Sequence, residues 1–206
     1  FDFKNILIEK PIEQSIDAID KIERAVSGRP AFVNHTRRMA PWYQKINDIL
    51  KNELRINCKV TFPLLGLACN SSHWIDLVNW WTKTLPISVD TSGLKNKWQE
   101  TKREGFWDIE GVLEINFENN SSLVIESFAD TQLPYLIEVA NGTNHVCTID
   151  EQNGKAIFTD GRVIEGTILP QSQLTGVLLD NLNNPEVRHL TALETSAKCN
   201  RLVTSE

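Results

Sequence analysis

Apolar residues near the start of the chain follow two different periods, which predict a strand–helix–strand unit. Residues Asn5–Ile8 form a short apolar run typical of a buried strand. Apolar positions then recur at spacings of three and four from Ile12 to Val26, as on one face of a helix. A second short apolar run follows at Ala31–Val33. Because such units are normally parallel and right-handed, we expect a βαβ unit over residues 1–34.

Alternating apolar and polar positions dominate the middle of the chain and predict an antiparallel sheet. A helix is expected at Pro41–Leu50, a strand at Arg55–Phe62, a second helix at Ser72–Lys83 and then a polar loop to about Trp98. Strands of alternating character are expected at residues 107–117, 122–128, 135–140, 145–149, 155–159 and 162–166. Helix returns from about residue 171 in two pieces separated near Pro185.

These elements predict an α/β remnant followed by an α+β region. The first part, residues 1–34, is expected to be a βαβ fragment. The second, residues 35–206, is expected to be an α/β domain with a large, mainly antiparallel open sheet flanked by helices. The opening Phe1 and the internal character of the first strand lead us to expect a piece of a longer protein.

Net charge and cysteine usage narrow the function classes. The formal net charge of −6 argues against nucleic acid as a partner, because binding phosphates requires a clustered basic surface. No apolar run approaches the roughly 20 residues that a membrane span needs. The four cysteines fall in no C-x-x-C spacing, and the charged first ten residues do not read as a signal peptide, so we expect free thiols in a cytoplasmic protein.

The first candidate for chemistry is the segment Glu9-Lys10-Pro11, which begins where the first apolar run ends. Ligands of parallel α/β sheets bind beyond the carboxyl ends of the strands. A lysine ammonium in a partly desolvated cleft there can polarise a hydroxyl oxygen or carry a proton. The alternative is a surface Glu–Lys pair at a strand end, and these three residues alone leave both interpretations open.

The second candidate is His73, on the helix expected over Ser72–Lys83. We expect it at the first helical position with Ser72 or Ser71 as N-cap, where the helix dipole favours a neutral imidazole. A neutral histidine can accept a proton from an alcohol, and Asp76, one turn further on, could orient the ring. A purely structural histidine is the alternative.

Arg37 and Arg38 follow the second expected strand, again on the ligand side of the sheet. An arginine there could clamp a phosphate or a carboxylate, whereas a surface arginine pair is the alternative. Cys69, His73 and Asp76 could in principle hold a metal ion. We expect no metal site, because the cysteine precedes the expected helix and no second histidine lies nearby in the sequence.

The order of these motifs resembles the Gfo/Idh/MocA oxidoreductases. ILIEKP, a helix, a short strand leading to NHTRRMAP, and HWIDL on a later helix occur in that order, and the resemblance spans nearly the whole chain. It implies that residues 1–34 are the C-terminal remnant of a nucleotide-binding (Rossmann) domain. It also implies that residues 35–206 form a substrate-binding α/β domain whose open sheet often mediates oligomerisation, hence a homo-oligomer. It also implies hydride transfer between NAD or NADP and a hydroxyl of a sugar, nucleotide sugar or cyclitol.

The resemblance also implies roles for individual residues. Lys10 matches the lysine of the family's EKP motif, which contacts both the nicotinamide cofactor and the substrate hydroxyl, and Glu9 and Pro11 complete this cofactor-binding motif. His73 matches the histidine usually assigned to acid/base chemistry. Arg38 matches the arginine of the RF-x-P segment, which we expect to bind substrate.

Two departures from the family pattern carry consequences. Cys69 stands where an aspartate is common, four residues before the histidine, so Asn70 and Asp76 complete the expected substrate-binding set. Asn70 can hydrogen-bond a sugar hydroxyl but cannot take a proton. The glycine-rich dinucleotide fingerprint expected upstream of EKP is absent from the 206 residues. We therefore expect this chain alone to bind NAD(P) weakly or not at all.

Two other functions compete with hydride transfer. One is a non-catalytic sugar-binding or assembly module, which Cys69 and the aromatic residues Trp80, Trp98 and Trp107 favour. The other is an NAD-dependent lyase or glycosidase that oxidises its substrate only transiently, as the resemblance also allows.

Overall fold

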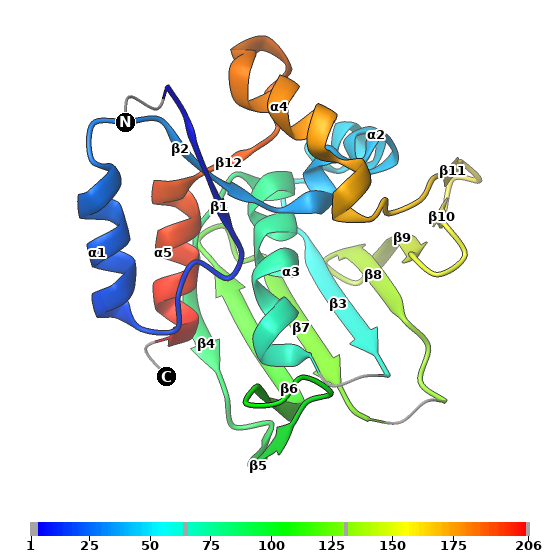
Figure 1. The fold of residues 1–206 in the computed structure, drawn as a ribbon. Coiled ribbons are helices and arrows are strands. Elements are labelled where there is room, and N and C mark those ends of the chain that lie inside the picture. Colours follow the sequence, from blue (N-terminus) through cyan, green and yellow to red (C-terminus); the bar gives the residue numbers. More distant parts are fainter. Residues whose placement is uncertain (1–3, 64–65, 130–131, 205–206) are drawn as a thin grey trace.

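The N-terminal strand–helix–strand unit forms as predicted, and a strand from the far end of the chain completes its sheet (Figure 1). The computed structural model describes residues 4–63, 66–129 and 132–204. In it, β1 (Ile6–Glu9) pairs in parallel with β2 (Ala31–Asn34), and α1 (Ile16–Val26) joins them. The third strand, β12 (Thr191–Ala192), pairs antiparallel with β2. Two residues are too few to show a period, so the sequence did not predict β12.

The C-terminal helix α5 (Leu193–Thr204) packs against α1. The Ser15 side chain caps the start of α1, and Ile19 on its apolar face is fully buried. Arg201 of α5 forms an ion pair with Asp20 of α1. Contacts made by α5 therefore connect residues 1–34 with the rest of the chain, while the division at residue 34 stays a prediction.

The second sheet has nine strands in the order β11-β10-β9-β8-β3-β7-β6-β4, with β5 paired to β6. All its strand pairs are antiparallel except β3 with β7, which confirms the predicted, mainly antiparallel sheet. Its strands are β3 (Asn57–Phe62), β4 (Pro86–Asp90), β5 (Leu94–Glu100), β6 (Trp107–Phe117), β7 (Ser122–Ser127), β8 (Leu136–Asn141), β9 (Asn144–Asp150), β10 (Lys155–Phe158) and β11 (Val163–Glu165).

The polar loop predicted before Trp98 is wrong, because β4 and β5 occupy that segment. Both strands pair with β6 at the border of the sheet, and most of their side chains are exposed. An edge strand of this kind carries charged residues instead of a buried apolar face, so its sequence does not alternate clearly.

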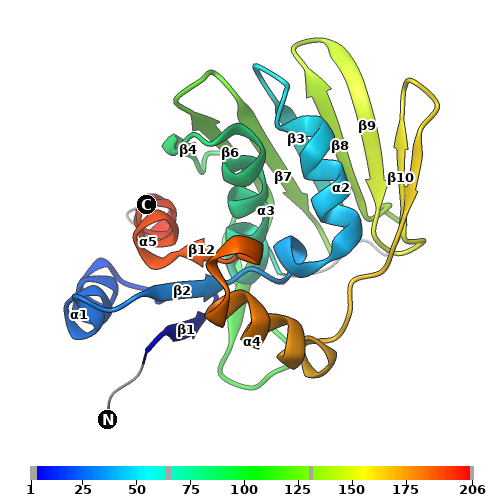
Figure 2. The ribbon, with the colours of Figure 1, turned by 90° about the horizontal axis from the view of Figure 1, so that it is seen from above.

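Helices α2 (Pro41–Leu50) and α3 (Leu67–Thr82) cover one face of the large sheet, as Figure 2 shows. The main core lies between them and the strands, and its largest buried side chains include Trp74, Trp81 and Tyr43. Helix α4 (Thr175–Asn183) and three short 3-10 helices, η1 (Thr36–Met39), η2 (Gln171–Gln173) and η3 (Pro185–Val187), complete the described elements.

The opposite face of the large sheet carries charged side chains as well as exposed apolar ones such as Ile157. Strand side chains alternate between faces, so the residues next to the core positions point away from α2 and α3. They include Lys59, Glu126 and Glu138, of which Lys59 and Glu126 form an ion pair. Self-association through this face stays a prediction.

Gly166, directly after β11, lies against the buried indole of Trp42, and we expect Gly166→Ala to destabilise the protein. A Cβ atom at this position would overlap the Trp42 ring, which is 2% exposed. Forcing extra volume into a packed core costs about 1–3 kcal/mol. Urea unfolding of the variant measures this loss. Gly176→Ala is the matched control, since that position in α4 has open space around it, and an equal effect of both changes would contradict the prediction.

Candidate functional site

Lys10 lies just beyond the carboxyl end of β1, and its ammonium reaches the first turn of α3. The Nζ atom is 3.3 Å from the carbonyl oxygen of Cys69 and 3.3 Å from Oδ1 of Asn70. It also lies 3.9 Å from the sulfur of Cys69. The structure therefore brings together three residues that the sequence placed about sixty positions apart, with Lys10 in the position expected for a ligand-binding lysine.

A cavity of about 740 Å³ borders Lys10, within the size range of small-molecule sites. The segment from Lys10 to Gln14 and the N-terminal half of α3 line part of it, and α5 lines another part. A further part of the wall comes from β5, the start of β6 and the connection between them, where Trp98, Phe106 and Trp107 are each more than one-third exposed. The cavity therefore combines an ammonium group with accessible aromatic rings.

Helix α3 begins at Leu67 and not at Ser72, so His73 lies in its second turn. The predicted first position of His73, and its cap by Ser72 or Ser71, are wrong. The residue before the helix is Gly66, and the carboxylate of Asp108 on β6 accepts the backbone N–H of Ala68 at 2.9 Å. A helix start stabilised by a side chain so distant in sequence leaves no local signal.

The imidazole of His73 is nevertheless kept neutral, by burial instead of the helix dipole. Removal from water lowers its pKa well below the ordinary value, and the charges of Arg37 and Lys10 lower it further. Among the described residues, Nδ1 of His73 has no hydrogen-bond partner. The ring packs edge-on against that of His35, with ring centroids 5.8 Å apart.

Arg38 and Asp76 form a buried, two-pronged ion pair. The Arg38 Nε and Nη2 atoms each donate to one Asp76 oxygen at 2.7 Å, and the hydroxyl of Thr191 donates to the same carboxylate at 2.6 Å. Burial alone would raise the pKa of Asp76, but the positive charge of Arg38 holds it below the usual value. The Asp76 carboxylate therefore contacts Arg38 and Thr191, and one of its oxygens lies 3.8 Å from Nε2 of His35. The contact in which Asp76 was expected to orient the His73 ring is not formed between these described residues.

Arg37 is buried in a second ion pair, so the alternative of a surface arginine pair is wrong. Its guanidinium donates to both oxygens of Glu151, at 2.6 and 2.7 Å. The hydroxyl of Tyr43 donates to the same carboxylate, and Arg37 also donates to Tyr135 at 2.9 Å. This network fixes η1 against the end of β9, and thereby holds Arg38 in place.

Sequence reasoning missed His35, which stands at the centre of the polar cluster. Its Nε2 lies 3.0 Å from the hydroxyl of Ser196 on α5. Burial lowers the pKa of His35, so it is neutral as well. The motif NHTRR contained His35, but no local feature distinguished it from its neighbours. The contribution of α5 became visible only with the fold.

Glu9 and Pro11 differ in their surroundings. The Glu9 carboxylate accepts hydrogen bonds from Asn34 at 2.9 Å and Gln171 at 2.6 Å, so it ties β1 to β2 and η2. Pro11 follows a cis peptide bond and lines the cavity.

Within the described parts of the chain, no three His, Cys, Asp or Glu side chains are grouped to hold a metal ion.

A βαβ unit is packed against a helix-covered, mainly antiparallel open sheet, and this arrangement defines the fold of the chain. The particular fold is that of the Gfo/Idh/MocA-type oxidoreductases, as solved structures show. The sequence itself matches no family model and no curated protein. Among the described residues, no helix has the length and apolar character needed to cross a membrane.

Three solved structures illustrate the likeness. A super-repressor mutant of Gal80p from Saccharomyces cerevisiae is 14% identical with a TM-score of 0.68, covering 98% of this chain and 69% of its own. The WlbA dehydrogenase from Bordetella pertussis, in complex with NADH and UDP-GlcNAcA, is 16% identical with a TM-score of 0.59, covering 97% and 67%. The myo-inositol dehydrogenase from Lactobacillus casei, in complex with NAD(H) and myo-inositol, is 12% identical with a TM-score of 0.60, covering 99% and 67%. At these identities the likeness concerns the fold.

Proposed function

We propose that this chain carries the substrate-binding and proton-transferring part of an NAD(P)-dependent oxidoreductase. Its substrate would be a hydroxyl of a sugar, a nucleotide sugar or a cyclitol. The observation that carries the proposal is the position of Lys10, beyond the carboxyl end of β1, against the first turn of α3 and at the wall of a 740 Å³ cavity. Two of the structurally similar proteins are dehydrogenases solved with nicotinamide cofactors and sugar-type ligands, which supports this choice.

The residues at the end of β1 fit the nicotinamide end of such a cofactor. Lys10 and Pro11 line the cavity, so a ring placed there would face the ammonium group. The sequence contains no glycine-rich turn to hold a pyrophosphate, so we assign no residue of this chain to that part of the cofactor. A bound nicotinamide would supply the hydride acceptor or donor.

The roles of the protein residues follow from charge and burial. The Lys10 ammonium would donate a hydrogen bond to the substrate oxygen and stabilise negative charge as the hydroxyl proton leaves. His73 lies three and four residues beyond Asn70 and Cys69, on the same side of α3, and Nδ1 of its neutral ring has no hydrogen-bond partner in the described parts of the chain. It would accept that proton, directly or through an intervening hydroxyl. Asn70 would hydrogen-bond a neighbouring sugar hydroxyl.

Turnover by the protein expressed from its full open reading frame tests the proposal. We expect one class among sugars, nucleotide sugars and cyclitols to be oxidised with NAD or NADP, detected as reduced nicotinamide and as a keto product by mass spectrometry. A tightly bound cofactor that recycles without net reduction would instead support the lyase or glycosidase reaction. No turnover with any class, combined with no binding of these compounds, would refute the proposal. Cytoplasmic location and self-association through the sheet belong to the same proposal.

A non-catalytic sugar-binding module is the second candidate, and the aromatic wall of the cavity favours it. Trp98, Phe106 and Trp107 could stack on sugar rings, and Cys69 replaces the carboxylate expected beside His73. One of the structurally similar proteins is a super-repressor mutant of Gal80p. Sugar binding that Trp107→Ala weakens, without any conversion of the sugar, would favour this function over oxidation.

A further inference from the structure

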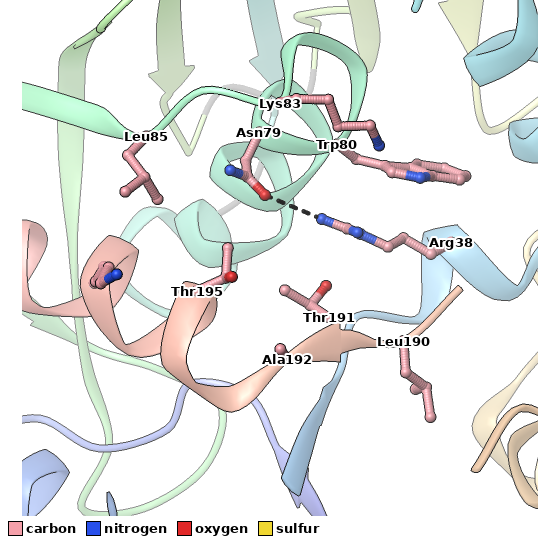
Figure 3. Close-up of a pocket in the computed structure, with 10 residues that line it drawn as sticks. Arg38, Asn79, Trp80, Lys83, Leu85, Leu190, Thr191, Ala192 and Thr195 are labelled. Carbon is pink, nitrogen blue, oxygen red and sulfur yellow. Dashed lines mark hydrogen bonds between the residues drawn. The ribbon is translucent and has the colours of Figure 1, made fainter. Parts of the chain in front are cut away.

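A second, smaller cavity lies beside Arg38, as Figure 3 shows. Its volume is about 290 Å³, and the last turns of α3 and the beginning of α5 form its walls. Arg38 lines this cavity, whereas Asp76 lines the larger one. The buried ion pair therefore lies between the two cavities, with the Arg38 guanidinium at the smaller cavity and the Asp76 carboxylate at the larger one.

Three basic side chains line the small cavity, and two of them, Arg38 and Lys198, already have a carboxylate partner. Arg38, Lys83 and Lys198 line it, and none of the described residues that line it is a carboxylate. Lys198 forms an exposed ion pair with Glu194, but Lys83 has no ion pair among the described residues. An ammonium group that lines a cavity without a carboxylate partner can bind an anion there.

The pKa values of two basic groups near Trp80, Lys83 and His189, are lowered. Burial, and next the charge of Arg38, lower the pKa of Lys83. The same two causes, in the same order, lower the pKa of His189, whose ring packs edge-on against Trp80. Figure 3 shows Lys83 and Arg38 above and below the Trp80 indole, and the Arg38 guanidinium lies 5.3 Å from the ring centroid. An anion would relieve the repulsion among these groups.

Neutral donors are also available at this cavity. Thr195, in the first turn of α5, lines it, and no hydrogen bond is formed by its hydroxyl with the described residues. The first backbone N–H groups of a helix have no partner within the helix and favour a negative charge. Asn79 is occupied, because it accepts from Arg38 and donates to the carbonyl of Thr84.

We propose that this cavity is a second binding site, specific for a phosphate group held by Lys83, Arg38 and Thr195. Its volume suits inorganic phosphate or a small phosphomonoester, and is less than half that of the cavity beside Lys10. The site lies apart from the cavity beside Lys10, because none of Lys83, Arg38 and Thr195 is among the described residues that line that cavity. Arg38 follows β2, where the sequence suggested an anion-binding arginine. The proposed anion lies in the smaller cavity, whereas Asp76 lines the larger one.

Binding of inorganic phosphate and of glycerol 3-phosphate to the 206-residue chain tests this site. We expect each addition to raise the melting temperature at constant ionic strength, with chloride as the comparison salt, since a ligand of the native state stabilises it. Isothermal titration then gives the two affinities and shows which source of phosphate is preferred. Absence of a shift with both compounds at millimolar concentration would overturn the proposal.

Lys83→Asn is the decisive variant. It removes the ammonium, and asparagine tolerates the left-handed backbone of Lys83 (φ 59°) at the end of α3. We expect phosphate affinity to fall about tenfold, as when one charged hydrogen-bond donor is lost. Lys102→Asn, with the same change of charge at an exposed turn, should leave binding unchanged. Weaker binding in Lys10→Ala, with Lys83→Asn unaffected, would place the phosphate in the larger cavity and refute the second site.

Discussion

Replacement of Lys10 by methionine is expected to lower turnover about a hundredfold or more, the size typical of losing a positioned proton-transfer or charge-stabilising group. The ammonium is the positive group at the wall of the larger cavity beside Asn70, and methionine retains the length of the side chain without the charge. The half-buried position of Lys10 predicts an unchanged fold. Steady-state kinetics on the substrate found for the wild type, together with circular dichroism, measure both quantities.

Two further variants separate the roles of Lys10. Lys10→Arg keeps the charge but not the compact ammonium, so substrate binding should persist while kcat falls. Lys21→Met, on the exposed side of α1, is the matched control and should behave as the wild type. Near-normal turnover in both Lys10→Met and His73→Gln would contradict the proposed mechanism.

The dependence of turnover on pH gives a second test of the roles of Lys10 and His73. In the wild type, the acid limb caused by protonation of His73 should lie well below neutral pH, because burial and the charges of Arg37 and Lys10 lower its pKa. In Lys10→Met one of these charges is gone, so the pKa of His73 rises and the acid limb moves to higher pH. An unmoved limb would show that another group controls the profile.

Strong periodicity made much of the fold predictable from sequence. Pro41–Leu50 and Trp107–Phe117 were predicted with the bounds that α2 and β6 have, because each presents an unbroken apolar face to the core. Prediction failed where packing, not pattern, decides the structure. The edge strands β4 and β5 expose most of their side chains, and β12 is defined only by its pairing with β2.

The site was predictable only in part, for a related reason. Lys10 and Asn70 stood out through their motifs, and the fold brings them together. His35 and Ser196 could not be found, because a contact between residues 161 positions apart depends on how α5 packs. Arg38 was recognised as an anion clamp, but its nearest anion, Asp76, belongs to the protein itself.

Removal of the Asp76 carboxylate is expected to cost more stability than any other single change argued from this structure. Asp76→Ala leaves the Arg38 guanidinium buried without its counter-ion and the Thr191 hydroxyl without its acceptor. Breaking a buried ion pair from one side costs about 3–5 kcal/mol of the free energy of unfolding. Urea unfolding at neutral pH measures the loss. Asp48→Ala, which breaks an exposed pair with Lys51, should change stability by only about 0.5 kcal/mol.

The pH dependence of stability tests the same pair. Because the native pKa of Asp76 is lower than that of an unfolded aspartate, its contribution is complete above about pH 4 and is lost as the pH falls through the native pKa. Asp76→Asn should lack this acid-dependent part. The double variant Arg38→Met/Asp76→Leu should recover part of the stability, since an apolar pair of similar volume often replaces a buried ion pair without loss. If Asp76→Ala unfolded like the wild type yet bound substrate poorly, Asp76 would belong to the substrate-binding set that the sequence predicted, and the ion pair would be incidental to the fold.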